Sequence, residues 1–124
     1  MQIKTGIDII EVNRIKEAIQ DLDEKFLKRV YTNYEIEYCN SKNNMKYQHF
    51  AARFAAKEAV FKAVSDELEN KFQINWKDIE ILNDEKGRPY VNILNNKIQN
   101  IEDIDISLSH CKEYAIANVV VIFK

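Results

Sequence analysis

The segment RFAAKEAVFKA (residues 53–63) predicts the fold more strongly than any other stretch of the sequence. Alanine, valine and phenylalanine fill most of its positions, which is typical of a helix packed against other elements on several sides. Arg53 and Lys57 are like charges one helical turn apart, an unfavourable pair unless an anion lies between them. Glu58 and Lys62 have the spacing of an ordinary solvated ion pair. We therefore expect a long central helix over about residues 47–68, with charges whose purpose must be found elsewhere in the chain.

Hydrophobic periodicity on both sides of this helix predicts the remaining elements. Before it we expect a strand at 3–10, helices at 12–22 and 25–30, a helix that begins at the Thr32–Glu35 capping box and runs to Cys39, and a loop at 40–46. After it the period changes to two, which predicts one hairpin from strands 78–82 and 90–94 and another from strands 104–109 and 114–123. The whole chain, 1–124, is thus predicted to be a single α+β domain: an N-terminal strand, helices, then an antiparallel meander.

Composition excludes several classes of protein. A formal net charge of −2 argues against a general nucleic-acid-binding protein. No apolar run reaches the roughly 20 residues that span a bilayer, and the N-terminus does not resemble a signal peptide. Two cysteines, two histidines and two glycines provide neither a zinc motif nor a glycine-rich phosphate loop. We expect a cytoplasmic protein with reduced thiols and no nucleic-acid or membrane partner.

Asp8 is an acid within an isoleucine-rich strand, and an aspartate there is costly to bury without a partner. One interpretation is that it lies at the end of the strand and caps the following helix. Another is that it joins Glu58 in binding a hard cation, because Mg²⁺ in proteins is usually held by one or two carboxylates together with phosphate oxygens. The local sequence leaves both interpretations open.

Five motifs occur together in one order and spacing: GIDIIEVNRI (6–15), RVYTNYEIEYC (29–39), RFAAKEAVFKA (53–63), GRPY (87–90) and SLSHCKEYAIA (107–117). Together they resemble the holo-acyl-carrier-protein synthase family, the small bacterial phosphopantetheinyl transferases. The resemblance covers essentially the whole chain and implies the fold of that family. It also implies an activity, transfer of 4′-phosphopantetheine from coenzyme A to a serine of acyl carrier protein, which serves fatty acid biosynthesis.

The resemblance implies a role for each residue at a motif position. Asp8 and Glu58 would bind Mg²⁺, and Lys62 and His110 would contact phosphates. Arg53, Lys57, Pro89 and Ser109 would lie along the coenzyme, and Arg14, Lys28 and Arg29 would bind the carrier, with Lys16 and Lys25 nearby. From the strand pattern alone, His110 is equally a histidine on the inner face of a strand. The family also forms homotrimers with a site at each subunit boundary, which suits a helix too apolar for one small domain to cover.

Two departures from the family pattern leave an alternative open. The segment after the long helix, VSDELENKF (64–72), has no glycine where relatives are glycine-rich, and Lys4 replaces another frequent glycine. A non-catalytic carrier-binding module with the same fold would show such losses, whereas the presence of Asp8, Glu58, Lys62 and His110 at the motif positions argues for the enzyme. A hydrolase that cleaves the pyrophosphate with water is the second alternative.

Overall fold

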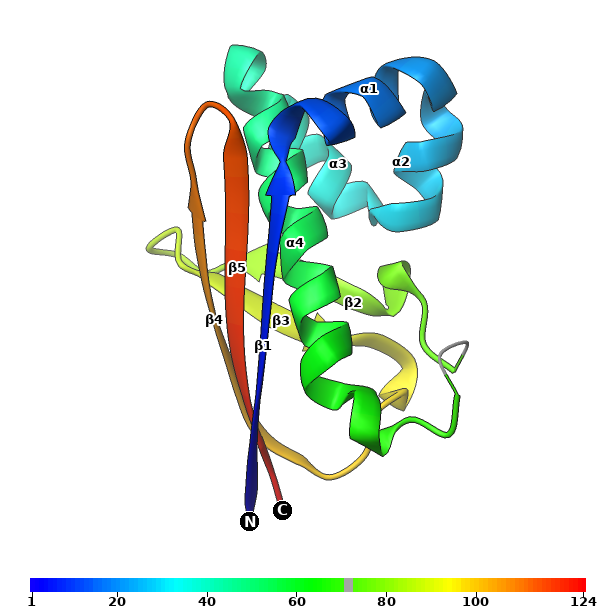
Figure 1. Cartoon of the computed structure of the whole chain (residues 1–124), viewed down its shortest axis with the longest axis vertical. Helices are drawn as coiled ribbons and strands as arrows, with labels where there is room; N and C mark the ends of the chain where they lie inside the picture. The colour runs from blue at the N-terminus through cyan, green and yellow to red at the C-terminus, as the bar shows by residue number, and fades with distance from the viewer. Residues whose placement is uncertain (71–72) are drawn as a thin grey trace.

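The computed structural model describes residues 1–70 and 73–124, and its long helix α4 (Lys46–Val64) runs through the centre of the molecule (Figure 1). Most of its buried side chains are alanine or valine, so neighbouring elements approach its axis closely. The helix ends at Val64, earlier than expected, because Ser65–Glu67 form the 3₁₀ turn η2 and Leu68 is extended. The glycine-free segment 64–72 therefore leaves the helix after Val64 and continues as a turn. Its residues 71 and 72 lie outside the described part of the chain.

Within the described residues, five strands form two antiparallel sheets. They are β1 (Gln2–Glu11), β2 (Ile79–Asn83), β3 (Pro89–Ile93), β4 (Ile101–His110) and β5 (Tyr114–Phe123). The larger sheet has the order β1-β5-β4, so the first strand lies beside the last and both termini meet at one end (Figure 1). β2 and β3 form the smaller sheet. The α+β class and both predicted hairpins, β2 with β3 and β4 with β5, are confirmed. The four strands do not form one meander, because β2 and β3 form a separate sheet and β5 also pairs with β1.

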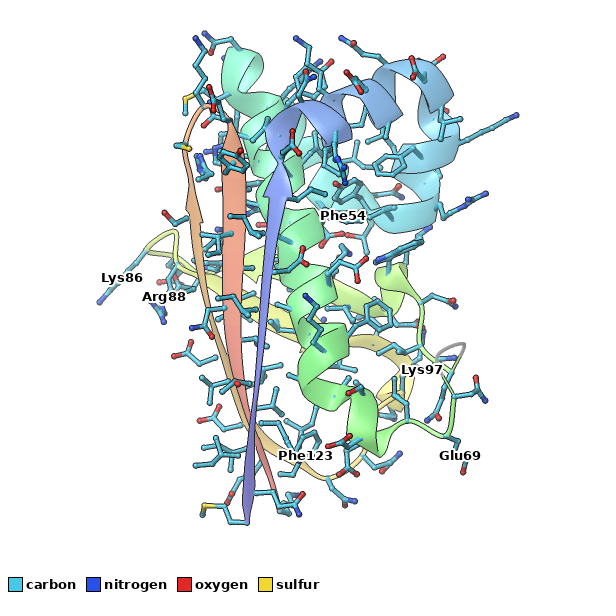
Figure 2. The ribbon with its side chains drawn as sticks, viewed as in Figure 1. Phe54, Glu69, Lys86, Arg88, Lys97 and Phe123 are labelled. Carbon is cyan, nitrogen blue, oxygen red and sulfur yellow. The ribbon has the colours of Figure 1, made fainter. Side chains whose placement is uncertain are left out.

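Three short helices pack against the N-terminal half of α4 (Figure 1). They are α1 (Val12–Leu22), α2 (Glu24–Val30) and α3 (Asn33–Asn40), and 3₁₀ turns η1 (Asn43–Met45), η3 (Trp76–Asp78) and η4 (Leu94–Asn96) lie in the connections. The predicted capping box is present, since Thr32 N–H donates to Glu35 Oε1 at 2.8 Å and Glu35 N–H to Thr32 Oγ1 at 3.4 Å. Phe54 of α4 (Figure 2) stacks at 6.3 Å on Phe26 of α2, which joins the two.

Gly6 allows β1 to pack directly on α4. A Cβ at this position would overlap the backbone carbonyl of Ala59 and crowd Ala63, and a helix backbone cannot rotate away as a side chain would. Side chains two residues apart on a strand point to the same face. The close approach at Gly6 therefore places the next inward-pointing residue, Asp8, beside the polar side chains of α4.

The outer face of β1 and β5, opposite α4, carries exposed apolar side chains. Ile3, Ile7 and Ile9 of β1 are 64%, 56% and 62% exposed, and Tyr114 and Val120 of β5 are exposed too. The apolar residues of α4, by contrast, are largely covered within the chain. The expected apolar excess is therefore real, but it lies on the sheet and not on the long helix. Within the described residues, no helix is both long and apolar enough to cross a membrane.

Candidate active site

Asp8 lies in the middle of β1, and its side chain points toward α4. Its Oδ1 is 3.2 Å from Lys62 Nζ, and the carboxylate is only 18% exposed. Helix α1 begins four residues later, at Val12, and its N-cap is Glu11, so the interpretation of Asp8 as a helix cap is wrong. The paired, half-buried carboxylate instead faces the surface of α4.

Glu58 projects from α4 into the same region. The indole Nε1–H of Trp76 donates to Glu58 Oε1 at 3.3 Å. Burial raises the pKa of the Glu58 carboxyl, the Trp76 hydrogen bond opposes that rise, and the negative charge of Asp8 adds to it. Glu58 and Lys62 form no ion pair, since Glu58 bonds to Trp76 and Lys62 to Asp8. Two neighbouring carboxylates at one surface form a place where a cation is favoured.

Both carboxylates line one open hollow of about 390 Å³, together with Glu11, Arg14, Phe54 and Tyr114. Among the described residues, no cluster of three or more histidine, cysteine or acidic side chains could hold a metal. Two carboxylates match the way Mg²⁺ is bound in phosphate-transferring sites, where water and phosphate oxygens complete its shell. Asp8 and Glu58 thus fit Mg²⁺ and do not fit a structural zinc site.

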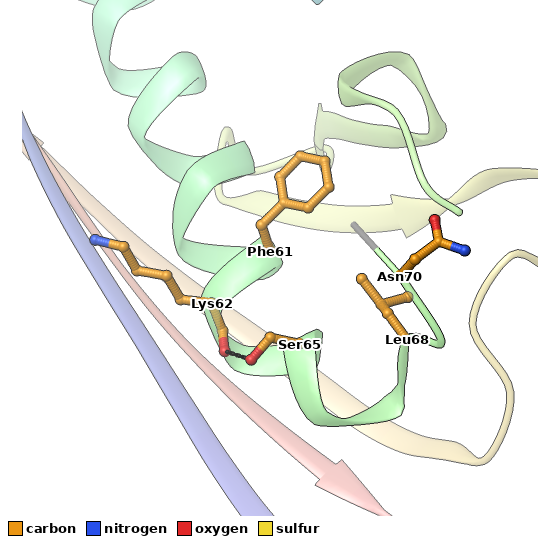
Figure 3. A pocket seen from close by; sticks show the side chains of 5 residues that line it. All are labelled: Phe61, Lys62, Ser65, Leu68 and Asn70. Atoms are coloured by element: carbon orange, nitrogen blue, oxygen red, sulfur yellow. Dashed lines mark hydrogen bonds between the residues drawn. The ribbon is translucent and has the colours of Figure 1, made fainter. Parts of the chain in front are cut away.

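Lys62 is more than half exposed, and its ammonium is anchored at the edge of this region. Its Nζ donates to the Ile7 carbonyl at 2.8 Å and to Asp8 Oδ1 at 3.2 Å. The base of the same side chain borders a second hollow of about 560 Å³ with Phe61, Ser65, Leu68 and Asn70 (Figure 3). The glycine-free segment therefore still forms the wall of a cavity next to the predicted phosphate-binding lysine.

Arg53, Pro89 and His110 lie together around a smaller hollow of about 150 Å³. Arg53 is buried, its Nη2–H donates to Asn83 Oδ1 at 2.8 Å, and its guanidinium stacks 4.1 Å from the Tyr38 ring centre. Its Nε finds no acceptor among the described residues. A buried donor without a partner beside a cavity is where an anionic or polar ligand would be stabilised.

His49, which the sequence analysis missed, lines the same hollow as His110. The two rings are 5.0 Å apart, and His110 Nδ1 is 2.8 Å from Gln48 Oε1. Burial, then the charge of Arg53, lowers the pKa of His49 to about 4, and the same two causes lower the pKa of His110. A neutral histidine pair beside a cation is poised to gain protons when an anion arrives. The spacing of His49 one helical turn before Arg53 could have revealed it.

Lys57 does not lie along a ligand site, so this expectation is corrected. Its side chain is fully buried, and its Nζ is 2.8 Å from Glu35 Oε1, 2.9 Å from the Trp76 carbonyl and 2.6 Å from the Ile79 carbonyl. Three acceptors use all three donors of an ammonium group, which supports the charged form although burial lowers the pKa of Lys57. The sequence led us to expect an anion beside Arg53 and Lys57. For Lys57 this anion is the carboxylate of Glu35, a residue of the protein itself.

Ser109 is also separated from its expected neighbours. It is exposed, and because adjacent strand residues point to opposite faces, its side chain leaves the sheet on the side away from His110. The expected carrier-binding residues lie on the helical layer: Arg14 is 3.7 Å from Glu11 and lines the hollow of Asp8 and Glu58, whereas Lys28 pairs with Glu24 at 3.1 Å and Arg29 is exposed on α2.

The site residues therefore form two groups within one chain. Asp8 belongs to β1 and His110 to β4, the opposite edges of the larger sheet. On α4, Arg53 and Glu58 are five residues apart, which separates their directions by roughly 140°. We call Asp8, Glu58 and Lys62 the carboxylate cluster, and Arg53, His110 and Pro89 the arginine pocket. One chain presents the two groups on different sides.

The comparisons with known proteins agree with one another. A family model described as the 4′-phosphopantetheinyl transferase superfamily matches residues 4–119. A holo-[acyl-carrier-protein] synthase of Ruminiclostridium cellulolyticum is 46% identical over 127 residues, which is 98% of this chain and 92% of that protein. A protein of the same description from Halothermothrix orenii is 46% identical over 93% of each chain.

Solved structures give the same result. The holo-[acyl-carrier-protein] synthase of Helicobacter pylori in complex with coenzyme A is 32% identical, with a TM-score of 0.83 over 95% of this chain and 99% of that one. A synthase from Bacillus anthracis in complex with CoA (3′,5′-ADP) is 35% identical, with a TM-score of 0.78 over 95% and 94% of the two chains. Both structures contain coenzyme-derived ligands.

Proposed function

Because the chain belongs to the 4′-phosphopantetheinyl transferase superfamily, we propose that it transfers 4′-phosphopantetheine from coenzyme A to a serine of apo acyl carrier protein. The observation that carries the proposal is the carboxylate cluster, in which Asp8, Glu58 and Lys62 come together on adjoining hollows. Similarity over nearly the whole chain to holo-[acyl-carrier-protein] synthases supports it.

The chemistry is an in-line displacement at phosphorus. The serine oxygen forms a bond to the phosphorus that carries the pantetheine arm, the bond from that phosphorus to adenosine 3′,5′-bisphosphate breaks, and the hydroxyl proton is released. Negative charge develops on the pyrophosphate oxygens, and a fixed cation that is already in place stabilises it. Lys62 provides such a cation, because its ammonium is held by the Ile7 carbonyl and Asp8.

Asp8 and Glu58 would hold Mg²⁺, which supplies additional positive charge to the pyrophosphate when it is bound. The arginine pocket suits the nucleotide end of the coenzyme, because Arg53 offers an unused buried donor and the two histidines gain charge near an anion. The hollow beside Lys62 suits the pantetheine arm, since Phe61 and Leu68 line it with apolar surface and Ser65 and Asn70 add polar groups (Figure 3).

The separation of the two groups supports an assembly of several chains. One coenzyme reaches both groups if the β1 edge of one chain lies beside the β4 edge of the next. The exposed apolar side chains on the outer face of β1 and β5, among them Ile7 and Ile9 of the edge strand β1, form the surface that such an assembly would cover. We therefore propose a homotrimer held together by this face, with each site built from two chains.

Complementation tests the shared site. Asp8→Asn and His110→Ala would each inactivate the protein alone, but co-expressed chains that form mixed assemblies should regain part of the activity, because some boundaries contain two intact halves. Light scattering gives the assembly state of each sample. Mixed assemblies with no recovered activity would show that both groups act within one chain.

Transfer of a fluorescent label from a coenzyme A conjugate to apo carrier tests the activity itself. A transferase labels the carrier, a non-catalytic carrier-binding module leaves it unlabelled, and a hydrolase releases free labelled phosphopantetheine. Addition of EDTA should stop labelling, and Mg²⁺ should restore it. Labelling that is indifferent to EDTA would remove the metal from the proposal.

A further inference from the structure

Trp76 is the single tryptophan of the chain, and its side chain ends at the carboxylate cluster. It begins the 3₁₀ turn η3, far from Glu58 in sequence, yet its Nε1–H donates to Glu58 Oε1 at 3.3 Å. An indole is only a donor, so this contact cannot exchange roles or accept a proton. It fixes which oxygen of Glu58 faces the indole and leaves Oε2 without that bond.

The indole is itself held in place from several directions. The backbone carbonyl of Trp76 accepts from Lys57 Nζ at 2.9 Å, and that ammonium is fixed by the buried Glu35 carboxylate. Its ring lies 6.0 Å from the ring of Phe54, and η3 begins with a bond from Asn75 N–H to Asp78 Oδ2 at 2.9 Å. The donor therefore sits on a rigid support, which is what a group that orients another side chain requires.

We propose that Trp76 is a positioning residue for Glu58: its N–H holds the carboxylate turned toward the hollow that Glu58 shares with Asp8. This inference rests on the proposed function, because it assigns to Glu58 a cation that Asp8 helps to bind. It also gives the buried Lys57–Glu35 pair a function, because this pair holds Trp76 in place and Trp76 in turn positions Glu58. A purely structural tryptophan would contribute packing against Phe54 and nothing to cation binding.

Two substitutions separate the hydrogen bond from the packing. Trp76→Phe keeps an aromatic ring against Phe54 and removes the donor. Replacement of the tryptophan by benzothienylalanine, in cells that require supplied tryptophan, exchanges the N–H for sulfur in a ring of nearly the same shape. Because the chain has one tryptophan, this replacement changes one position only. Lys77→Ala, an exposed neighbour in the same turn, is the matched control.

Mn²⁺ serves as the probe, and the loss of its free electron paramagnetic resonance signal reports binding to the full-length protein with coenzyme A present. Wild type and Lys77→Ala should bind equally, and Glu58→Gln should abolish the site. Both Trp76 substitutions should raise the Mn²⁺ dissociation constant about tenfold, the usual effect of removing an outer partner of a metal-binding side chain. In activity assays the Mg²⁺ concentration for half-maximal rate should rise with it, while KM for the carrier stays unchanged.

The outcomes distinguish the two proposals. If wild-type protein does not bind Mn²⁺, or binds it equally well after Glu58→Gln, the proposed metal site and this inference are both overturned. Binding that depends on Glu58 but is changed less than twofold by both Trp76 substitutions would overturn the inference alone. If Trp76→Phe does not fold, the benzothienylalanine protein decides the question.

Discussion

Lys57→Met is the substitution with the most clearly defined consequence. Methionine keeps an unbranched side chain of similar length, so the change removes charge and three hydrogen bonds without opening a large cavity. The ammonium contacts Glu35, the Trp76 carbonyl and the Ile79 carbonyl, and the lysine side chain itself is fully buried. We therefore expect Lys57 to act in folding and in the support of Trp76, and not in direct contact with coenzyme.

The contacts of Lys57 set the size of the expected loss in the free energy of unfolding. Removal of one partner from a buried ion pair costs about 3–5 kcal/mol, because the other charge stays buried without compensation. Glu35 keeps the Ile81 N–H on Oε2 at 2.8 Å and the Thr32 N–H on Oε1, which soften the loss. The two carbonyls lose their donor, which adds to it. We expect a loss of about 3 kcal/mol, a large part of the roughly 5–15 kcal/mol of a typical domain.

Urea unfolding at a fixed protein concentration measures this loss. The double variant Glu35→Gln with Lys57→Met should recover part of it, since no charge remains buried alone. A loss below about 1 kcal/mol in the single variant, combined with weaker coenzyme binding, would refute the reasoning and return Lys57 to the ligand site.

Three further substitutions probe the fold, the arginine pocket and the carrier surface. Gly6→Ala should lower the free energy of unfolding by about 3 kcal/mol, the upper end of overpacking, because its Cβ meets the backbone of Ala59; unchanged thermal unfolding would contradict the close packing. Because the pKa of His49 is about 4 when folded and 6.5 when unfolded, its contribution to stability should be full above pH 6.5 and fall toward pH 4 by about 1 kcal/mol, allowing for its partial exposure, and His49→Gln should reduce that slope to the share that comes from His110. Arg14→Glu should weaken use of the carrier at low salt, whereas the exposed control Lys86→Glu should not; equal carrier kinetics would place docking elsewhere.

Local patterns predicted the elements well. The alternation that defines β5 gave its bounds, and the Thr32–Glu35 spacing gave the start of α3, because both signals depend on residues close in sequence. The strand order could not be read in the same way. The pairing of β1 with β5 joins the two ends of the chain, and the alternation of each strand is compatible with many partners.

The limits of prediction are clearest at Glu35. In the sequence, the capping box alone explained why a glutamate stands at this position. In the structure, its carboxylate also pairs with Lys57 and accepts from Ile81 N–H. Nothing local indicated these distant partners, so Lys57 was placed at the ligand site. Trp76 was missed for the same reason, because its bond to Glu58 joins segments 18 residues apart.

The carboxylate cluster shows the opposite case. Asp8, Glu58 and Lys62 were predicted together from family motifs, and the structure places them on adjoining hollows. Their roles remain predictions, but the structure does bring the three side chains together. The interpretation of Asp8 as a helix cap and that of Glu58 and Lys62 as a surface ion pair did not anticipate this. An aspartate in mid-strand and a glutamate paired with an indole have no capping or surface ion-pair role here.

Intact-protein mass spectrometry of apo acyl carrier protein, incubated with coenzyme A, Mg²⁺ and this protein, tests the central claim most directly. The carrier should gain the mass of one phosphopantetheine group on its serine, and adenosine 3′,5′-bisphosphate should appear in equal amount. Asp8→Asn and Glu58→Gln, which keep the shape of each side chain, should leave the carrier unmodified while the protein stays folded. A carrier left unmodified by folded wild-type protein, or full modification by either variant, would contradict phosphopantetheine transfer at the carboxylate cluster.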